Sequence, residues 1–349
     1  MTKLRVLVVE DSITVRKRLC EVLAQDPELE VVGEAGNGKL AIDLCQTLRP
    51  DVLTMDMMLP RMNGLAATEH IMAYFPTPIL VISSSYNRGE LFRTYDALAA
   101  GAVDVLEKPD GDEPEDDWER RLISSVKMVS RISVVTHLRA RVNARLHALP
   151  ASGRPRCRLI AIGASTGGPS AMVEVLRALP SPLCAPVLMV LHINERFGTA
   201  FAEWLDQQTP HRVAFAQDGE VLAAARGRVL MAPPGRHLMV SDGCLRLMQE
   251  PERHACRPSI DYLFESLASE CGAATAACLL TGMGCDGAAG LLRIHRAGGL
   301  TIAQNEATSL IYGMPREAVL IGAAQRVLPL GEIGPALAAA TTPGPGGET

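Results

Sequence analysis

The sequence predicts an α/β protein made of two doubly wound parallel-sheet domains in succession, the second of which also carries a β-hairpin. Short apolar runs alternate with stretches of helical periodicity along most of the 349 residues. This alternation is typical of parallel strands joined by helical crossovers. A basic stretch that ends in Pro, Ser and Gly interrupts the alternation near the middle of the chain, as a connection between two domains would.

Composition narrows the class of protein. The chain is 48% hydrophobic and 21% charged, which is the balance of a globular protein with substantial cores. Its formal charge of −5 gives no electrostatic reason to expect nucleic-acid binding. The nine cysteines show no C-x-x-C spacing, so neither a disulfide framework nor a zinc site is indicated. Acidic residues cut the first apolar run short and no run is long enough to span a membrane, so we expect a cytoplasmic protein without membrane insertion.

The first part of the chain contains five apolar runs, and each is expected to form a strand of one sheet. The predicted strands are 4–9, 31–35, 51–55, 78–82 and 103–106. The predicted helices are 13–25, 38–48, one after Gly64 that runs to about Tyr74, one near 90–99, and 118–131. Continuous rather than alternating hydrophobicity in these strands indicates a parallel sheet covered on both faces.

Five polar residues follow the carboxyl ends of these strands. They are Glu10, Asp11, Asp56, Ser83 and Lys108. Ligands of open α/β sheets bind along this edge, so we expect the five side chains to converge. Three neighbouring carboxylates repel one another unless a hard divalent cation lies among them, and Mg²⁺ prefers such oxygen ligands. Lys108 and Ser83 would then complete a site for a phosphoryl group on Asp56, whereas any one of the five taken alone reads as a surface residue of a loop.

These residues, with DMMLPRMNG (56–64) and GAVDVLEKP (101–109), resemble the receiver domain of two-component response regulators. The resemblance implies a flavodoxin-like fold in which Asp56 accepts phosphate from a histidine kinase. It also implies that Glu10, Asp11 and Asp56 hold Mg²⁺, and that Ser83 and Lys108 form the switch. The sequence departs from the pattern at Glu10, where Asp is usual, and at Val105, where many receivers carry an aromatic residue.

The second part of the chain begins with a strand–turn–helix unit. A strand at 158–162 and a helix beginning at Pro169 enclose the small-residue turn 163–168, which contains Ser165. Such a turn directs backbone N–H groups at whatever lies in it, so Ser165 is placed as a nucleophile beside an oxyanion site. A tight packing turn is the alternative. A phosphate-binding loop is not indicated, because neither G-x-G-x-x-G nor G-K-[ST] is present.

The remaining strands of this domain are also apolar runs. They are expected at 185–191, 227–232, 274–280, 300–303 and 326–328, with a hairpin of 237–241 and 244–248 and a helix at 201–205.

Ser165, His192 and Asp286 each lie on a loop after a probable strand, and together they predict a serine hydrolase. A serine hydroxyl needs a base to take its proton, and the base works best when an acid fixes its tautomer. His237 also follows a strand and is the alternative base. His192 is preferred because its strand comes directly after the Ser165 helix, which favours neighbouring positions in the sheet. The chain order Ser, His, Asp differs from that of α/β-hydrolases, chymotrypsin and subtilisin.

Several motifs of this domain resemble the catalytic domain of CheB-type chemotaxis methylesterases. They are GASTGGP (163–169), VLMAPPGRH (229–237), RPSID (257–261), TGMGCDGAAGL (281–291) and YGMPREA (312–318). The resemblance implies hydrolysis of glutamate γ-methyl esters on chemoreceptors with release of methanol, and deamidation of receptor glutamines. No cofactor is expected for the ester chemistry, and phosphorylation of the receiver is expected to activate it.

The same resemblance assigns roles to individual residues. Ser165 is the nucleophile, His192 the general base and then acid, and Asp286 the orienting carboxylate. Backbone N–H groups of Thr166 and Met283 form the oxyanion site. The segment Asn194–Phe197 departs from the family, which often has a proline-containing sequence there.

The predicted domain boundaries are 1–131 for the receiver, 132–156 for a linker, 157–340 for the catalytic domain and 341–349 for a disordered tail. Two other functions stay open at this point. One is a receiver-controlled serine esterase with a different substrate. The other is a phosphorylation-switched binding module whose triad is catalytically silent.

Overall fold

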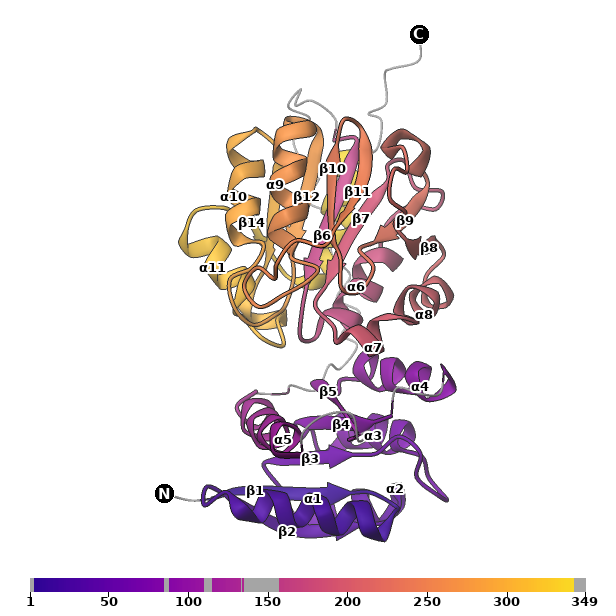
Figure 1. Cartoon of the computed structure of the whole chain (residues 1–349), viewed down its shortest axis with the longest axis vertical. Helices are drawn as coiled ribbons and strands as arrows, with labels where there is room; N and C mark the ends of the chain where they lie inside the picture. Colours follow the sequence, from indigo (N-terminus) through magenta and orange to yellow (C-terminus); the bar gives the residue numbers. More distant parts are fainter. Residues whose placement is uncertain (1–2, 85–87, 110–114, 133, 135–156, 342–349) are drawn as a thin grey trace. The chain divides into compact units, whose positions relative to one another are not determined.

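The computed structural model describes residues 3–84, 88–109, 115–132, 134 and 157–341. The chain divides into two compact units, Met1–Arg141 and Val142–Thr349 (Figure 1). Of the predicted linker, only Ile132 and Val134 lie among the described residues, and the predicted tail beyond Thr341 lies outside them.

The first unit is built on a five-stranded parallel sheet in the order β2-β1-β3-β4-β5. This is the flavodoxin-like order that the sequence predicts. The strands are β1 (Leu4–Val9), β2 (Leu29–Ala35), β3 (Val52–Met55), β4 (Ile79–Ser83) and β5 (Asp104–Glu107). The helices are α1 (Ile13–Gln25), α2 (Gly38–Leu48), α3 (Gly64–Tyr74), α4 (Arg88–Ala99) and α5 (Glu115–Ser130).

Local sequence explains where the first three helices begin. Ser12, Asn37 and Asn63 precede them, and each side-chain oxygen accepts a backbone N–H of the first helical turn. Such caps replace hydrogen bonds that the first turn cannot make within the helix. The caps fix where these helices begin, which keeps the loops after β1 and β2 short, whereas a longer loop that begins with Asp56 separates β3 from α3.

The second unit contains a seven-stranded parallel sheet in the order β14-β13-β12-β6-β7-β9-β8. Its strands are β6 (Leu159–Ala164), β7 (Val187–Leu191), β8 (Arg212–Phe215), β9 (Arg228–Met231), β12 (Thr275–Leu279), β13 (Leu300–Gln304) and β14 (Arg326–Leu328). Central strands β6, β7 and β12 are buried along their whole length, as expected of a sheet covered on both faces. The order changes direction at β6, which places the Ser165 turn at the point where ligands of such sheets bind.

Helices of the second unit follow the strands as crossovers (Figure 1). They are α6 (Gly168–Arg177), α7 (Glu195–Gly198), α8 (Phe201–Gln208), α9 (Ile260–Glu270), α10 (Ala288–Arg296), α11 (Met314–Leu320) and α12 (Leu330–Thr341). Thr341, which the sequence places in the tail, is the buried last residue of α12.

A separate antiparallel hairpin joins β10 (His237–Ser241) to β11 (Cys244–Met248), as predicted to the residue. Its two-residue turn, Asp242-Gly243, has φ of 53° and 69°, and these left-handed conformations suit Asp and Gly.

Several elements of the second unit are not among those predicted from the sequence. They are strand β8 and helices α7, α9, α10, α11 and α12. Helix α9 nevertheless carries Ile260, Leu263, Phe264 and Leu267 at helical spacing, and all four are fully buried. Within the described ranges, no helix is both long enough and apolar enough to cross a bilayer.

Candidate functional site

Three carboxylates gather at the edge of the first sheet. Glu10 and Asp11 follow β1 and Asp56 follows β3, and their ligand oxygens all lie within 4.8 Å of one another. Lys108 follows β5, and its Nζ lies 2.9 Å from Glu10 Oε2 and 3.0 Å from Asp56 Oδ1. The structure therefore brings together the charged groups of four of the five residues predicted for this edge.

Burial dominates the electrostatics of this cluster. It raises the pKa of Asp56 despite the opposing charge of Lys108. Burial and the charge of Asp56 also raise the pKa of Glu10. Burial disfavours the Lys108 cation, but the two carboxylates outweigh it and raise the pKa of Lys108. One ammonium group faces three carboxylates, so the cluster retains excess negative charge. An all-oxygen donor set with that excess fits a hard divalent cation such as Mg²⁺.

Ser83 contributes its backbone, but not its hydroxyl, to this cluster. Its carbonyl accepts the Lys108 N–H at 3.0 Å. Its fully buried hydroxyl instead donates to Glu90 Oε1 at 2.9 Å and accepts from Thr94 Oγ1 at 2.9 Å. Glu90 also accepts the backbone N–H and the hydroxyl of Ser84. In this structure the predicted switch hydroxyl is therefore engaged by helix α4.

In the second unit, strand pairing places Ser165 beside His192. Ala164 at the end of β6 pairs with Leu191 at the end of β7, and each candidate residue comes next in its strand. The His192 N–H donates to Ala164 O at 3.0 Å, and the Ser165 N–H donates to Thr281 O at 3.1 Å. Among the described residues, no hydrogen bond joins the Ser165 hydroxyl to His192. The backbone sets the two residues side by side, and the proton can pass once the Ser165 hydroxyl forms a hydrogen bond with His192.

His192 and Asp286 form the central pair of this site. The distance from His192 Nε2 to Asp286 Oδ2 is 2.8 Å, and the exposed fractions of the two side chains are 11% and 2%. Because a carboxylate only accepts hydrogen bonds, Nε2 carries a proton and Nδ1 is the nitrogen left to act as a base. Burial disfavours the imidazolium, but the bond to Asp286 and the nearby Cys256 outweigh it and raise the pKa of His192 to about 9.

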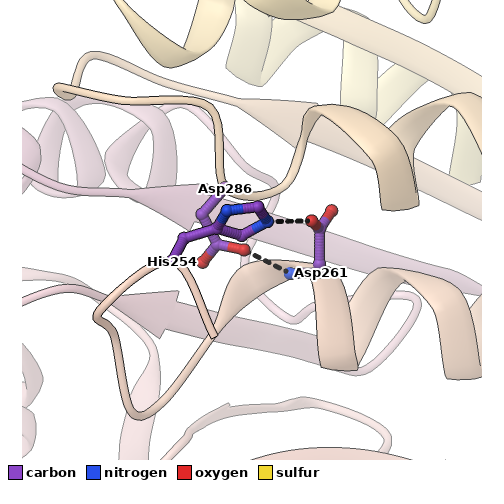
Figure 2. A group of neighbouring side chains, drawn as sticks. All are labelled: His254, Asp261 and Asp286. Atoms are coloured by element: carbon purple, nitrogen blue, oxygen red, sulfur yellow. Dashed lines mark hydrogen bonds and ion pairs between the residues drawn. The ribbon is translucent and has the colours of Figure 1, made fainter. Parts of the chain in front are cut away.

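The N-terminus of helix α9 holds the Asp286 carboxylate. Oδ1 accepts the Asp261 N–H at 3.1 Å (Figure 2). Oδ1 also accepts the Ser259 hydroxyl at 2.7 Å, and Oδ2 accepts the Ile260 N–H at 2.7 Å. Burial raises the pKa of Asp286, but His192 and these donors outweigh it and leave the pKa below its ordinary value. The carboxylate is thus kept ionised and fixed in orientation, as a residue that orients a base must be.

His237, which the sequence offers as the alternative base, has both ring nitrogens engaged in hydrogen bonds that support the local structure. It is fully buried, its Nε2 donates to Pro251 O at 3.1 Å, and its Nδ1 accepts the Ser259 N–H at 3.0 Å. Its ring stacks on Tyr262 with centroids 4.0 Å apart. Burial lowers the pKa of His237, which matches a neutral ring with both nitrogens bonded. Neither nitrogen is available for a substrate, so His192 is the better candidate base.

The two candidate oxyanion donors lie on adjoining loops. The Thr166 and Met283 N–H groups take part in no hydrogen bond among the residues that the structure describes. Thr281 Oγ1 donates to Thr166 O at 3.0 Å and so ties the two loops together. A Cβ on Gly282 would lie 2.6 Å from Ser165 Cβ, which shows how closely the Met283 loop passes the serine. This geometry suits a pair of N–H groups that receive charge developing beside Ser165.

Comparison with known proteins shows which family the chain belongs to. The model of the CheB methylesterase family matches residues 160–337, and that of the response regulator receiver domain matches residues 6–114. A protein of Anaeromyxobacter dehalogenans named protein-glutamate methylesterase/protein-glutamine glutaminase 2 is 43% identical over 334 residues, covering 96% of each chain. A protein of the same name without a number, from Nitrosospira multiformis, is 40% identical over 345 residues, again covering 96% of each. The chain belongs to the CheB methylesterase family.

A solved structure of this family supports the fold of the second unit. The CheB methylesterase catalytic domain of Thermotoga maritima superposes with a TM-score of 0.50 at 31% identity, covering 53% of this chain and 99% of that one. Together with the five-stranded parallel sheet of the first unit and its match to the receiver-domain model, this confirms the two α/β parallel-sheet domains predicted from the sequence.

The segment after His192, Asn194–Phe197, forms a short helix. The Asn194 side chain accepts the Arg196 N–H and begins α7, and Phe197 is fully buried. Asn194, Glu195 and Arg196 are exposed, so polar side chains follow the candidate base closely in the chain.

Sequence reasoning missed two contributors to the site. Ser259 bonds the orienting carboxylate, and Cys256 Sγ lies 3.5 Å from His192 Nδ1. Both lie in the segment before α9, and the helical periodicity of Ile260–Glu270 is the one signal that would have placed a helix N-terminus there. Nothing in the sequence links Cys256 to a histidine 64 residues earlier.

Proposed function

We propose that this protein is a phosphorylation-activated protein-glutamate methylesterase that also deamidates glutamine. Its substrates would be the methylated glutamates of chemoreceptors, and it would act in the cytoplasm. The observation that carries the proposal is the Asp286–His192 pair at 2.8 Å, set by strand pairing beside Ser165 in a member of the CheB methylesterase family.

The chemistry follows from the hydrogen-bond pattern. Asp286 accepts from Nε2, so Nδ1 of His192 takes the Ser165 proton as the serine oxygen attacks the γ-carbonyl of the ester. The backbone N–H groups of Thr166 and Met283 stabilise the negative charge that develops on that carbonyl oxygen by donating hydrogen bonds to it. His192 then gives its proton to the departing methoxide, which leaves as methanol.

Water completes the reaction. His192 takes a proton from water, the hydroxide attacks the acyl-enzyme, and the proton returns to Ser165 as glutamate is released. With a glutamine substrate the same steps release ammonia. The original Ser165 proton leaves with the methanol or ammonia and a proton from water replaces it, so the enzyme regains its starting state and no external reductant or oxidant enters the balance.

The first unit would regulate the activity of the second unit through phosphorylation. Asp56 would accept a phosphoryl group from a histidine kinase, with Glu10, Asp11 and Asp56 holding Mg²⁺. Bound there, the ion supplies positive charge that offsets the charge of the phosphoryl oxygens. Lys108 would then exchange its contact with Asp56 for one with the phosphoryl group, and the Ser83 hydroxyl would leave Glu90 to bond it. The domain boundaries 1–131 and 157–340, with the linker between them, are part of this proposal.

The test is methanol release from methylated receptor membranes, with and without a small phosphodonor and Mg²⁺. We expect release that rises with the phosphodonor, disappears in Ser165→Ala, and loses its response to the phosphodonor in Asp56→Asn. Turnover of simple esters with no release from receptor would favour an esterase with another substrate. Receptor binding with no Ser165-dependent turnover would favour a binding module.

A further inference from the structure

Two carboxylate–imidazole–thiol lines run side by side in the second unit. In the first, Asp286 contacts His192 Nε2 and Cys256 Sγ lies 3.5 Å from His192 Nδ1. In the second, Asp261 Oδ2 lies 3.2 Å from His254 Nε2 and Cys285 Sγ lies 3.6 Å from His254 Nδ1. Each imidazole therefore has one nitrogen fixed by a carboxylate and the other facing a sulfur.

The spacing in the first line matches two ligands of one zinc ion. Tetrahedral Zn²⁺ binds imidazole nitrogen at about 2.0–2.1 Å and thiolate sulfur at about 2.3 Å, so these two ligand atoms lie about 3.6 Å apart. The observed separation of His192 Nδ1 and Cys256 Sγ is 3.5 Å. Metal-bound histidines usually give their other N–H to a carboxylate, and Asp286 occupies that place here. A half-buried thiol beside an imidazole also favours zinc over Mg²⁺, which prefers oxygen.

The neighbouring group of His254, Asp261 and Asp286 is a weaker metal site. Their ligand atoms lie within 4.8 Å of one another (Figure 2). However, both oxygens of Asp286 already accept donors from the start of α9, and Asp261 accepts the Gly290 N–H at 2.7 Å. Arg253 also lies 3.4 Å from Asp261 Oδ2. A cation there would have to displace these donors, whereas the pair of His192 and Cys256 needs to lose only protons.

We propose that Zn²⁺ binds between His192 Nδ1 and Cys256 Sγ and inhibits the enzyme. The ion replaces the thiol proton and the proton of Nδ1, and water completes its coordination. Binding occupies the nitrogen that would take the Ser165 proton, so the metal blocks the base while Asp286 stays in place. This inference rests on the proposed function for the inhibition, but not for the binding.

Binding is tested on the full chain with Co²⁺ as the spectroscopic probe and Mg²⁺ in excess to occupy oxygen ligands. We expect a thiolate-to-cobalt charge-transfer band in the near ultraviolet that Zn²⁺ abolishes by displacement. Cys256→Ala should remove the band, and His192→Gln should weaken cobalt binding at least about tenfold, as expected for loss of one ligand of a chelate. Cys285→Ala is the matched control, because its thiol faces the other histidine, and it should keep the band.

Three spectral results would overturn the proposal: no band in the wild type, a band that survives Cys256→Ala but not Cys285→Ala, or cobalt affinity unchanged in His192→Gln. No band in the wild type would mean that no thiolate binds the metal. A band that depends on Cys285 would place the metal beside His254. Unchanged affinity in His192→Gln would mean that this imidazole is not a ligand.

Inhibition is measured as methanol release, each variant against its own metal-free rate. Zinc should inhibit the wild type and Cys285→Ala alike, and a chelator that prefers zinc to magnesium should restore the rate. Cys256→Ala should need at least about tenfold more zinc for half-inhibition. Equal zinc sensitivity of Cys256→Ala and wild type would overturn the inhibitory role. If no variant releases methanol at all, the proposed function fails while the cobalt spectra still decide the site.

Discussion

At the scale of single residues, the most consequential feature is the pair of bonds on the His192 ring. Asp286 on Nε2 and Cys256 near Nδ1 raise the pKa of His192 to about 9, although burial opposes them. A base must be neutral to take a proton, so the active form of His192 is the minor one at neutral pH. The rate of ester hydrolysis should therefore increase as the pH rises toward the pKa of His192.

We therefore expect kcat/KM for ester hydrolysis to rise with pH, by about tenfold per unit below the pKa of His192, and to level off near pH 9. Because the neighbouring Cys256 contributes to the raised pKa of His192, Cys256→Ala should move the midpoint to lower pH. The check is a pH–rate profile of both proteins on one ester substrate. A profile that falls between pH 7 and 9, or an identical midpoint in the variant, would contradict this reading.

Lys108 has a comparable position in the first unit, as the cation between two buried carboxylates. Lys108→Met should lower the free energy of unfolding by about 2–4 kcal/mol, because it leaves Glu10 and Asp56 facing each other without a counter-ion. This expected loss of stability is at the low end of the losses measured when a buried ion pair is broken, because the Lys108 side chain is partly exposed to solvent.

Mg²⁺ provides the control for this variant. The loss of stability should shrink when Mg²⁺ is added, since the cation then neutralises the same oxygens. Denaturant titrations with and without Mg²⁺ measure both effects. A loss that is the same at every Mg²⁺ concentration would speak against a shared carboxylate site.

At the scale of elements, helix α9 determines how the acid of the site is held. Its first N–H groups and Ser259 bind Asp286, and its start packs against Gly287, which follows Asp286. Gly287 has φ of 86°, and a Cβ there would lie 2.6 Å from Ile260 Cγ2. The close approach of this glycine to the helix start keeps the carboxylate within reach of its donors.

Gly287→Ala should therefore reduce both stability and activity. Left-handed backbone and the contact with Ile260 together should cost about 2–4 kcal/mol, and we expect kcat to fall more than tenfold as the start of α9 shifts. Gly322→Ala is the matched control, because its φ is 72° but no atom lies within 4 Å of the added Cβ. It should lose about 1–2 kcal/mol and keep full activity. Equal loss of activity in the two variants would contradict the role assigned to the Gly287 contact.

The elements also show what the sequence can and cannot predict. The bounds of β1, α1, α2 and the hairpin agree with the prediction to the residue, because caps, Gly-containing turns and apolar runs mark them locally. Strand β8 was missed because it is only four residues long and only one of the four is buried. The engagement of Ser83 by Glu90 and of His192 by Cys256 depends on how distant segments pack, and no local pattern carries that information.

At the scale of the whole molecule, each unit contains one of the two tryptophans. Trp118 is buried in α5, where its Nε1 donates to Glu107 O at 2.7 Å, next to Lys108. Trp204 is buried in α8 against Phe201, with ring centroids 5.2 Å apart. Fluorescence of single-tryptophan variants can therefore follow the unfolding of each unit separately.

We expect beryllofluoride with Mg²⁺, a mimic of the phosphoryl group, to stabilise only the first unit. In Trp204→Phe, whose signal comes from Trp118, the free energy of unfolding should rise by about 2.7 kcal/mol at a hundredfold excess over Kd. In Trp118→Phe, whose signal comes from Trp204, the transition should stay where it is. Denaturant titrations of both variants make the comparison. Parallel shifts of the two signals would show that the units unfold as one.

The pairing of Ala164 with Leu191 has a consequence for how such enzymes diversify. Ser165 and His192 owe their proximity to the ladder between β6 and β7, and not to the loop that begins at Asn194. Exchanges of the exposed side chains Asn194, Glu195 and Arg196 leave the ladder, and hence the spacing of the two residues, intact. The position of the reacting groups and the character of the surface beside them are thus encoded in separate stretches of chain. The surface can vary between members of the family while the spacing of the reacting groups is inherited unchanged.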